Sequence, residues 1–107
     1  MNHPEEQFLA QSRQEHGFLT PMELRALAEE CGNTVFDFSS VLISRGVRMG
    51  MRNIVYPNVI LKTEGDGLID IGDGNTFFPG TIIRSTGKVR IGNGNEIGEG
   101  EIVMRSE

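Results

Sequence analysis

Histidine and cysteine, which commonly carry acid–base, nucleophilic and metal chemistry, are scarce in this 107-residue sequence. The two histidines, His3 and His16, lie near the amino terminus among glutamates, so we interpret both as solvated surface imidazoles. Cys31 is the single cysteine, which excludes an internal disulfide and a multi-cysteine zinc site. Because no histidine is close to it in the sequence, we interpret Cys31 as an inert thiol and not as a nucleophile.

Two further patterns resemble ligand sites without completing them. The turn at residues 71–74 is glycine-rich like a phosphate-binding loop, but it lacks the following helix and the Lys-Ser/Thr ending. Asp70 and Asp73 stand outside any run of alternating acidic ligands, so the sequence predicts no calcium site and no other metal site. Exposed carboxylates are poor bases at neutral pH, so no catalytic role is assigned to Glu96, Glu99 and Glu101 near the carboxyl end of the sequence.

The composition limits the classes of partner. The chain carries 10 basic and 15 acidic residues, for a net charge of −5, and the basic residues do not cluster. A sequence-independent nucleic-acid-binding protein is expected to show a basic stripe, so we predict no nucleic-acid partner. The amino terminus has no basic segment followed by an apolar run, and no apolar stretch approaches ~20 residues. We therefore expect no signal peptide, no membrane partner and a cytoplasmic location.

Residues 1–34 are predicted to form a helical segment. Pro4 suits the first turn of one helix, and Gly17 is a natural stop for it. A second helix is predicted after Thr20-Pro21-Met22-Glu23, where Thr20 caps the helix and Glu23 completes a capping box. Apolar residues then recur at helical spacing until Gly32 ends the run. We expect this segment to cover the open end of the domain that follows, with partner binding as the alternative.

The rest of the chain is repetitive. Of the 14 glycines, 12 lie from Gly46 onward, which marks a change in the character of the chain. Three segments, 49–61, 71–83 and 91–103, align at offsets of 22 and 20 residues, with glycine in the second place and asparagine in the fifth. Large apolar residues recur at steps of six within each segment. They are Met49, Val55 and Leu61; Ile71, Phe77 and Ile83; and Ile91, Ile97 and Val103.

This repeat predicts a mainly β domain over residues 35–107, a parallel β-helix (solenoid) of about 3–4 coils. A pair of apolar residues two apart precedes each segment, as at Val47 and Met49, which is the period of a strand with one buried face. We expect glycine and asparagine at the corners, where φ can be positive. The repeat length varies only within 62–68 and 84–88, which places the insertions on a surface corner. A degenerate first copy is expected at residues 36–43.

The six-residue step with a small second residue resembles the hexapeptide-repeat family of left-handed parallel β-helices. The stretch from Val47 to Leu61 is similar to the opening coils of the acetyltransferase domain of bacterial N-acetylglucosamine-1-phosphate uridyltransferase, and residues 53–59 carry the likeness. The likeness covers residues 47–103. It implies a left-handed solenoid, a homotrimer, acetyl-CoA as a co-substrate that is not tightly bound, and a small-molecule acceptor such as a sugar nucleotide. The chain stops just after an apolar position, which is consistent with the leading part of a longer solenoid.

The sequence departs from the family at its catalytic residue. Acyltransferases of this family use a solenoid histidine as general base, and residues 17–107 contain no histidine. The zinc carbonic anhydrases of the family need three histidines, so that branch is excluded. We therefore predict an acyltransferase-type domain that is inactive as this chain alone, with no catalytic or cofactor-binding residue assigned. The alternative is a non-catalytic solenoid that serves as an assembly or scaffold module.

Overall fold

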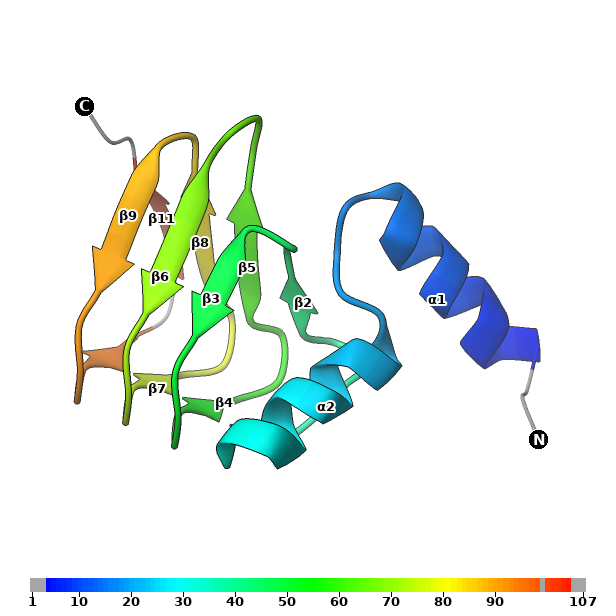
Figure 1. The fold of residues 1–107 in the computed structure, drawn as a ribbon, viewed down its shortest axis with the longest axis horizontal. Helices are drawn as coiled ribbons and strands as arrows, with labels where there is room; N and C mark the ends of the chain where they lie inside the picture. The colour runs from blue at the N-terminus through cyan, green and yellow to red at the C-terminus, as the bar shows by residue number, and fades with distance from the viewer. Residues whose placement is uncertain (1–3, 99, 105–107) are drawn as a thin grey trace.

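The structure is a computed structural model that describes residues 4–98 and 100–104, with side chains over 7–98. Over these residues the chain forms two helices, α1 (Pro4–Glu15) and α2 (Pro21–Cys31), followed by short parallel strands (Figure 1). The strands are β1 (Thr34–Val35), β2 (Leu42–Ile43), β3 (Val47–Met49), β4 (Ile54–Val55), β5 (Ile60–Thr63), β6 (Leu68–Ile71), β7 (Thr76–Phe77), β8 (Thr81–Ser85), β9 (Lys88–Ile91), β10 (Glu96–Ile97) and β11 (Gly100–Met104). Neither helix is long and apolar enough to cross a membrane, and the described residues contain no other helix.

The second helix begins and ends as its sequence predicts. The Thr20 hydroxyl accepts a hydrogen bond from the Glu23 N–H (3.2 Å), and the Glu23 carboxylate accepts one from the Thr20 N–H (2.9 Å). Gly32 follows α2 in the left-handed conformation, with φ of 65°. Leu24 and Ala28 on the inner face of α2 are buried in the same hydrophobic core as the strands. The helix therefore packs over the first coil, and α1 lies farther from the strands (Figure 1).

The strands stack into a parallel β-solenoid of about three turns, which confirms the predicted fold class. Each of the first three coils contributes one strand to each of three sheets, and β10 and β11 add a fourth strand to two of them. The sheets are ordered β1-β4-β7-β10, β2-β5-β8-β11 and β3-β6-β9. Figure 1 shows β3, β6 and β9 side by side along one face. The predicted first copy is present, but its first strand lies at Thr34–Val35, just before residue 36. The predicted insertions also lie on one corner, between β5 and β6 and between β8 and β9.

The pairing register places the predicted apolar residues above one another. Ile71 pairs with Met49 and Ile91, and Phe77 pairs with Val55 and Ile97. Ile71 and Phe77 are fully buried, with at most 1% of their surfaces exposed. The step of six is therefore the distance along the chain from one inward position to its equivalent on the next side of the coil.

One predicted pairing in the last coil is wrong. The step of six aligns Val103 with Ile83, whereas the structure pairs Ile102 with Ile83 and Val103 with Arg84. The cause is the length of the corner: three residues separate β7 from β8, and two separate β10 from β11. A shift of one residue exchanges the two faces of a strand, so the last strand follows its own register.

The predicted positive φ at the corners is confirmed at glycines such as Gly80 (79°) and at Asn58 (65°), but not at the repeated asparagines. Asn53 and Asn75 are fully buried and do not have positive φ. The positive φ belongs to the residue before each asparagine, which is Arg52 in one coil (58°) and Gly74 in the next (69°). The asparagine side chains form hydrogen bonds with backbone groups at the corner, where the chain has no strand pairing. They therefore stabilise the corner through hydrogen bonds and not through conformational freedom.

Candidate functional site

A polar hollow of about 560 Å³ lies at the corner where β2 leads into β3 and β5 leads into β6. Its polar lining comes from His16, Ser44, Arg45, Thr63 and Asp66, with four glycines between them. This hollow brings together an imidazole, two hydroxyls, a guanidinium and a carboxylate, which are side chains capable of acid–base chemistry and hydrogen bonding. It is therefore the candidate site for chemistry on a small molecule.

The segment after α1 positions one wall of this hollow. Phe18 forms an isolated antiparallel bridge with Ser44, and the Leu19 N–H donates to the Ile43 carbonyl (2.8 Å). The Arg45 N–H donates in turn to the Gly17 carbonyl (3.1 Å). These bonds fix the end of α1 against the first coil. They place His16 beside the solenoid, although His16 lies outside the repeat in sequence.

The geometry of His16 defines which ring nitrogen is available. Its Nδ1 lies 2.7 Å from the Ser12 carbonyl oxygen, which can only accept a hydrogen bond. Nδ1 therefore carries the proton in the neutral imidazole, and Nε2 carries the lone pair. The side chain is exposed, as the sequence analysis predicted. Its position beside the solenoid was not predicted, because the only sign of it in the sequence is the short apolar link Phe18-Leu19 after Gly17.

A salt bridge balances the arginine of the hollow. The Arg45 guanidinium donates to both carboxylate oxygens of Glu23, at 2.7 and 2.8 Å. Hydrogen bonding from Arg45, followed by that from the Thr20 backbone, lowers the pKa of Glu23 to about 2. The same contact raises the pKa of Arg45. Because Glu23 also belongs to the capping box, this pair connects the start of α2 to the corner of the solenoid.

The remaining wall is built by close backbone contacts. Ser44 is buried, and its hydroxyl accepts a hydrogen bond from the Thr63 N–H (3.1 Å). Gly46 faces Thr63 so closely that a Cβ atom would lie 2.8 Å from the Thr63 hydroxyl and 2.9 Å from the Gly67 carbonyl. A larger residue at Gly46 would therefore have to displace the wall. Asp66 lies exposed in the tight turn that follows, in which the Gly67 N–H donates to the Glu64 carbonyl (2.9 Å).

The other reactive residue types do not gather at one site. Cys31 is a half-buried free thiol at the end of α2, and Glu96 is exposed on β10. His3, Glu99 and Glu101 lie outside the residues whose side chains are described. Among the described residues, no group of three or more His, Cys, Asp and Glu side chains is placed to hold a metal ion.

A row of aromatic rings runs along the outside of the solenoid and was not predicted. Phe36, Tyr56 and Phe78 occupy equivalent positions, each one residue after the first strand of its coil. The Phe36 and Tyr56 ring centroids lie 5.0 Å apart, and those of Tyr56 and Phe78 lie 5.7 Å apart. We name these three residues the aromatic ladder. Its signal in the sequence was the aromatic residue one position beyond the inward residue in three successive copies.

Comparison with known proteins gives no relative: no family model, no curated protein and no solved structure matches the chain.

Proposed function

We propose that this chain is a hexapeptide-repeat domain of acyltransferase type. The observation that supports this proposal is that inward residues six apart occupy successive sides of a three-sided parallel coil, as Val55 and Leu61 do. In the family that this pattern resembles, the solenoid is left-handed and its members act as homotrimers. We extend both properties to this chain as part of the proposal, together with a cytoplasmic location.

The proposed reaction transfers an acyl group from acyl-CoA, with acetyl-CoA as the expected co-substrate, to a hydroxyl or amine. The acceptor would be a small molecule such as a sugar nucleotide. Attack on the thioester requires a base that removes the acceptor proton, and the repeat contains no histidine for this purpose. We therefore propose that this chain alone does not catalyse the acyl transfer, and that further coils or another chain complete the site.

A thermal-shift titration with acetyl-CoA, run beside a thiol-release assay with sugar and amine acceptors, tests this proposal. A saturable shift without thiol release is the expected result. If the titration gives no thermal shift and the assay gives no thiol release, the transferase assignment is contradicted and the assembly module is favoured. Release above background would contradict the proposed inactivity of the chain. Because His16 lies in the polar hollow, His16→Asn would then show whether it supplies the base.

A further inference from the structure

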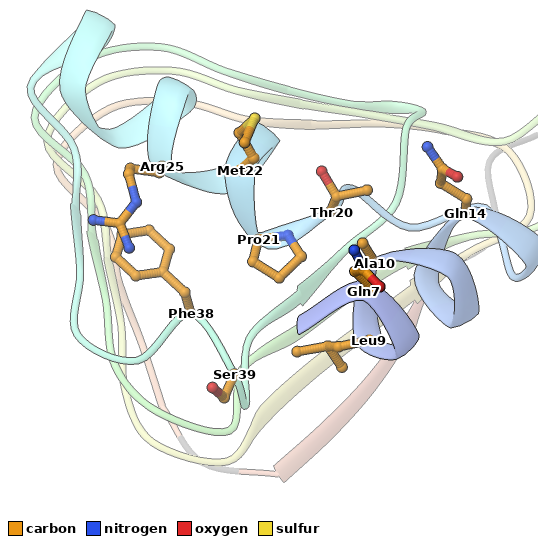
Figure 2. A pocket seen from close by; sticks show the side chains of 10 residues that line it. All are labelled: Gln7, Leu9, Ala10, Gln14, Thr20, Pro21, Met22, Arg25, Phe38 and Ser39. Atoms are coloured by element: carbon orange, nitrogen blue, oxygen red, sulfur yellow. The ribbon is translucent and has the colours of Figure 1, made fainter. Parts of the chain in front are cut away.

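A second hollow lies between the two helices and the corner that joins β1 to β2 (Figure 2). Its volume is about 520 Å³, which is within the range of small-molecule sites. Leu9 and Ala10 line it from α1, Pro21 and Met22 from the first turn of α2, and Phe38 from the corner. Carbon atoms therefore form most of its surface. The Met22 side chain is 79% exposed.

Among the lining residues whose side chains the structure describes, the charge is of one sign. Arg25 is the single ionisable residue of that set, and it contains no acid. Its guanidinium carbon lies 4.9 Å from the centre of the Phe38 ring, and Figure 2 shows the two side chains in contact. Within the described part of the chain, Arg25 forms no ion pair with a carboxylate. A guanidinium stacked on a ring keeps the N–H groups at its edge free for an anion.

A second arginine adds positive charge behind the wall. Arg13 is 3% exposed, and its Nη2 donates to the carbonyl of Ser39, a lining residue, at 2.7 Å. Its Nε and Nη1 have no partner among the described residues. Burial lowers the pKa of Arg13, and the charge of Asp37 opposes that effect. An arginine stays charged even so. Among the side chains that the structure describes, two arginines therefore act on the hollow and Asp37 offsets only part of their charge.

We infer that this hollow binds a small apolar carboxylate. The apolar body of the ligand packs against Leu9, Pro21 and Phe38, and its carboxylate accepts hydrogen bonds from Arg25. A planar guanidinium matches a carboxylate with two parallel N–H···O bonds, and a neutral ligand would leave that cation unpaired. The inference does not depend on the proposed transferase role, because the hollow is built by the helices and one corner.

The test uses 4-phenylbutanoate and its neutral analogue 4-phenylbutanol as probes. Methionine methyl NMR reports the site, because Met22 lies in the lining and Met51 does not. Met22→Leu identifies the Met22 signal. The carboxylate is expected to shift the Met22 signal saturably and leave Met51 unchanged. The alcohol is expected to bind at least about tenfold more weakly, because it carries no negative charge to pair with Arg25 and cannot accept two parallel hydrogen bonds from it.

Substitutions then separate charge from shape. Arg25→Gln should weaken the carboxylate about tenfold and leave the alcohol unchanged. Arg48→Gln, on the exposed face of β3, is the matched control and should change neither affinity. Ala10→Phe should fill the hollow and weaken both probes, with unchanged amide spectra elsewhere to show that the chain folds. Equal affinities for the two probes, an unchanged affinity in Arg25→Gln, or a Met22 signal that does not move would each overturn the inference.

Discussion

The Oδ1 atom of Asn53 accepts two hydrogen bonds from Asn75, one from its backbone N–H (2.8 Å) and one from its Nδ2 (3.1 Å). Asn75 repeats the arrangement, because its own Oδ1 accepts from the Asn95 N–H (2.8 Å) and its Nδ2 donates to the Gly92 carbonyl (2.8 Å). Each asparagine thus connects one coil to the next at a corner that has no strand pairing. The buried amides form a continuous polar row beside an apolar interior.

Removing one amide from this row should destabilise the fold. Asn75→Ala leaves the Asn95 N–H and the Gly92 carbonyl without their partners, so we expect a loss of about 2–3 kcal/mol in the free energy of unfolding. Asn95→Ala is the matched control, because Asn95 occupies the same repeat position and its side chain is exposed. Its loss should stay near ~0.5 kcal/mol. Urea denaturation measures both, and equal losses would show that the row does not stabilise the corner.

The inward register predicts a large difference between two charge substitutions. Ile71 is 1% exposed between Met49 and Ile91, so Ile71→Asp buries an unpaired carboxylate and should cost more than about 4 kcal/mol. Arg84 faces solvent, and its Nη2 contacts the Glu64 carboxylate at 3.3 Å. Arg84→Asp should therefore cost less than about 1 kcal/mol. Similar melting temperatures for the two variants would refute the register.

The Glu23–Arg45 contact should make stability depend on pH in a defined window. The pKa of Glu23 is lowered from 4.5 to about 2 in the folded chain. A lowered folded-state pKa stabilises the fold above the unfolded value, and this contribution is lost as pH falls from about 4.5 to about 2. The difference in melting temperature between the natural chain and Glu23→Gln should be constant from pH 7 to 5 and shrink below pH 4.5. When Arg45→Gln is already present, adding Glu23→Gln should change the melting temperature at pH 7 by less than it does in the natural chain. A difference in melting temperature that grows as the pH falls would contradict a stabilising Glu23–Arg45 contact.

The aromatic ladder should be extendable by one ring. Gly98 follows β10 as Phe78 follows β7, and a Cβ atom at Gly98 would meet nothing within 4 Å. We expect Gly98→Tyr to stack on Phe78 and stabilise the fold by about 0.5–1 kcal/mol. Gly98→Ser adds a side chain without a ring and serves as the control. Thermal unfolding compares the two, and a tyrosine variant no more stable than the serine variant would argue against stacking.

Self-association should follow from the outer face of the β2-β5-β8-β11 sheet. Leu42, Ile60 and Ile82 pair in register along this face, and all three are partly exposed. We expect light scattering to give a mass near three times 11.8 kDa, in keeping with the proposed trimer. Ile60→Asp should reduce that mass to one chain while leaving the fold intact. A single-chain mass for the natural sequence at high micromolar concentration would contradict the trimer.

The sequence predicts the solenoid because the feature that defines it is local. Inward residues such as Ile71 and Phe77 recur at fixed steps, and glycines mark the turns between them. The register of β11 was predicted wrongly because the corner before it is one residue shorter than the corner before β8, and nothing in the residue types of the corner indicates that difference. The two hollows could not be predicted, since each depends on how α1 meets the first coil. Arg13 shows the limit most clearly: nothing in its sequence neighbourhood indicates that it is buried against Ser39.

The stacking of coils also determines how this molecule responds to force. Equivalent strands lie 20, 22 and 20 residues apart, as Thr34, Ile54, Thr76 and Glu96 show, and their hydrogen bonds run along the stack. Tension applied along that direction loads the hydrogen bonds between one pair of neighbouring coils at a time. In a sheet pulled parallel to its strands, by contrast, all the bonds between two strands bear the load together. Each released coil would lengthen the chain by about 70 Å, at ~3.4 Å for each of its roughly 20 residues. The extension trace would then show equal, weak steps, and the stack would yield gradually under load.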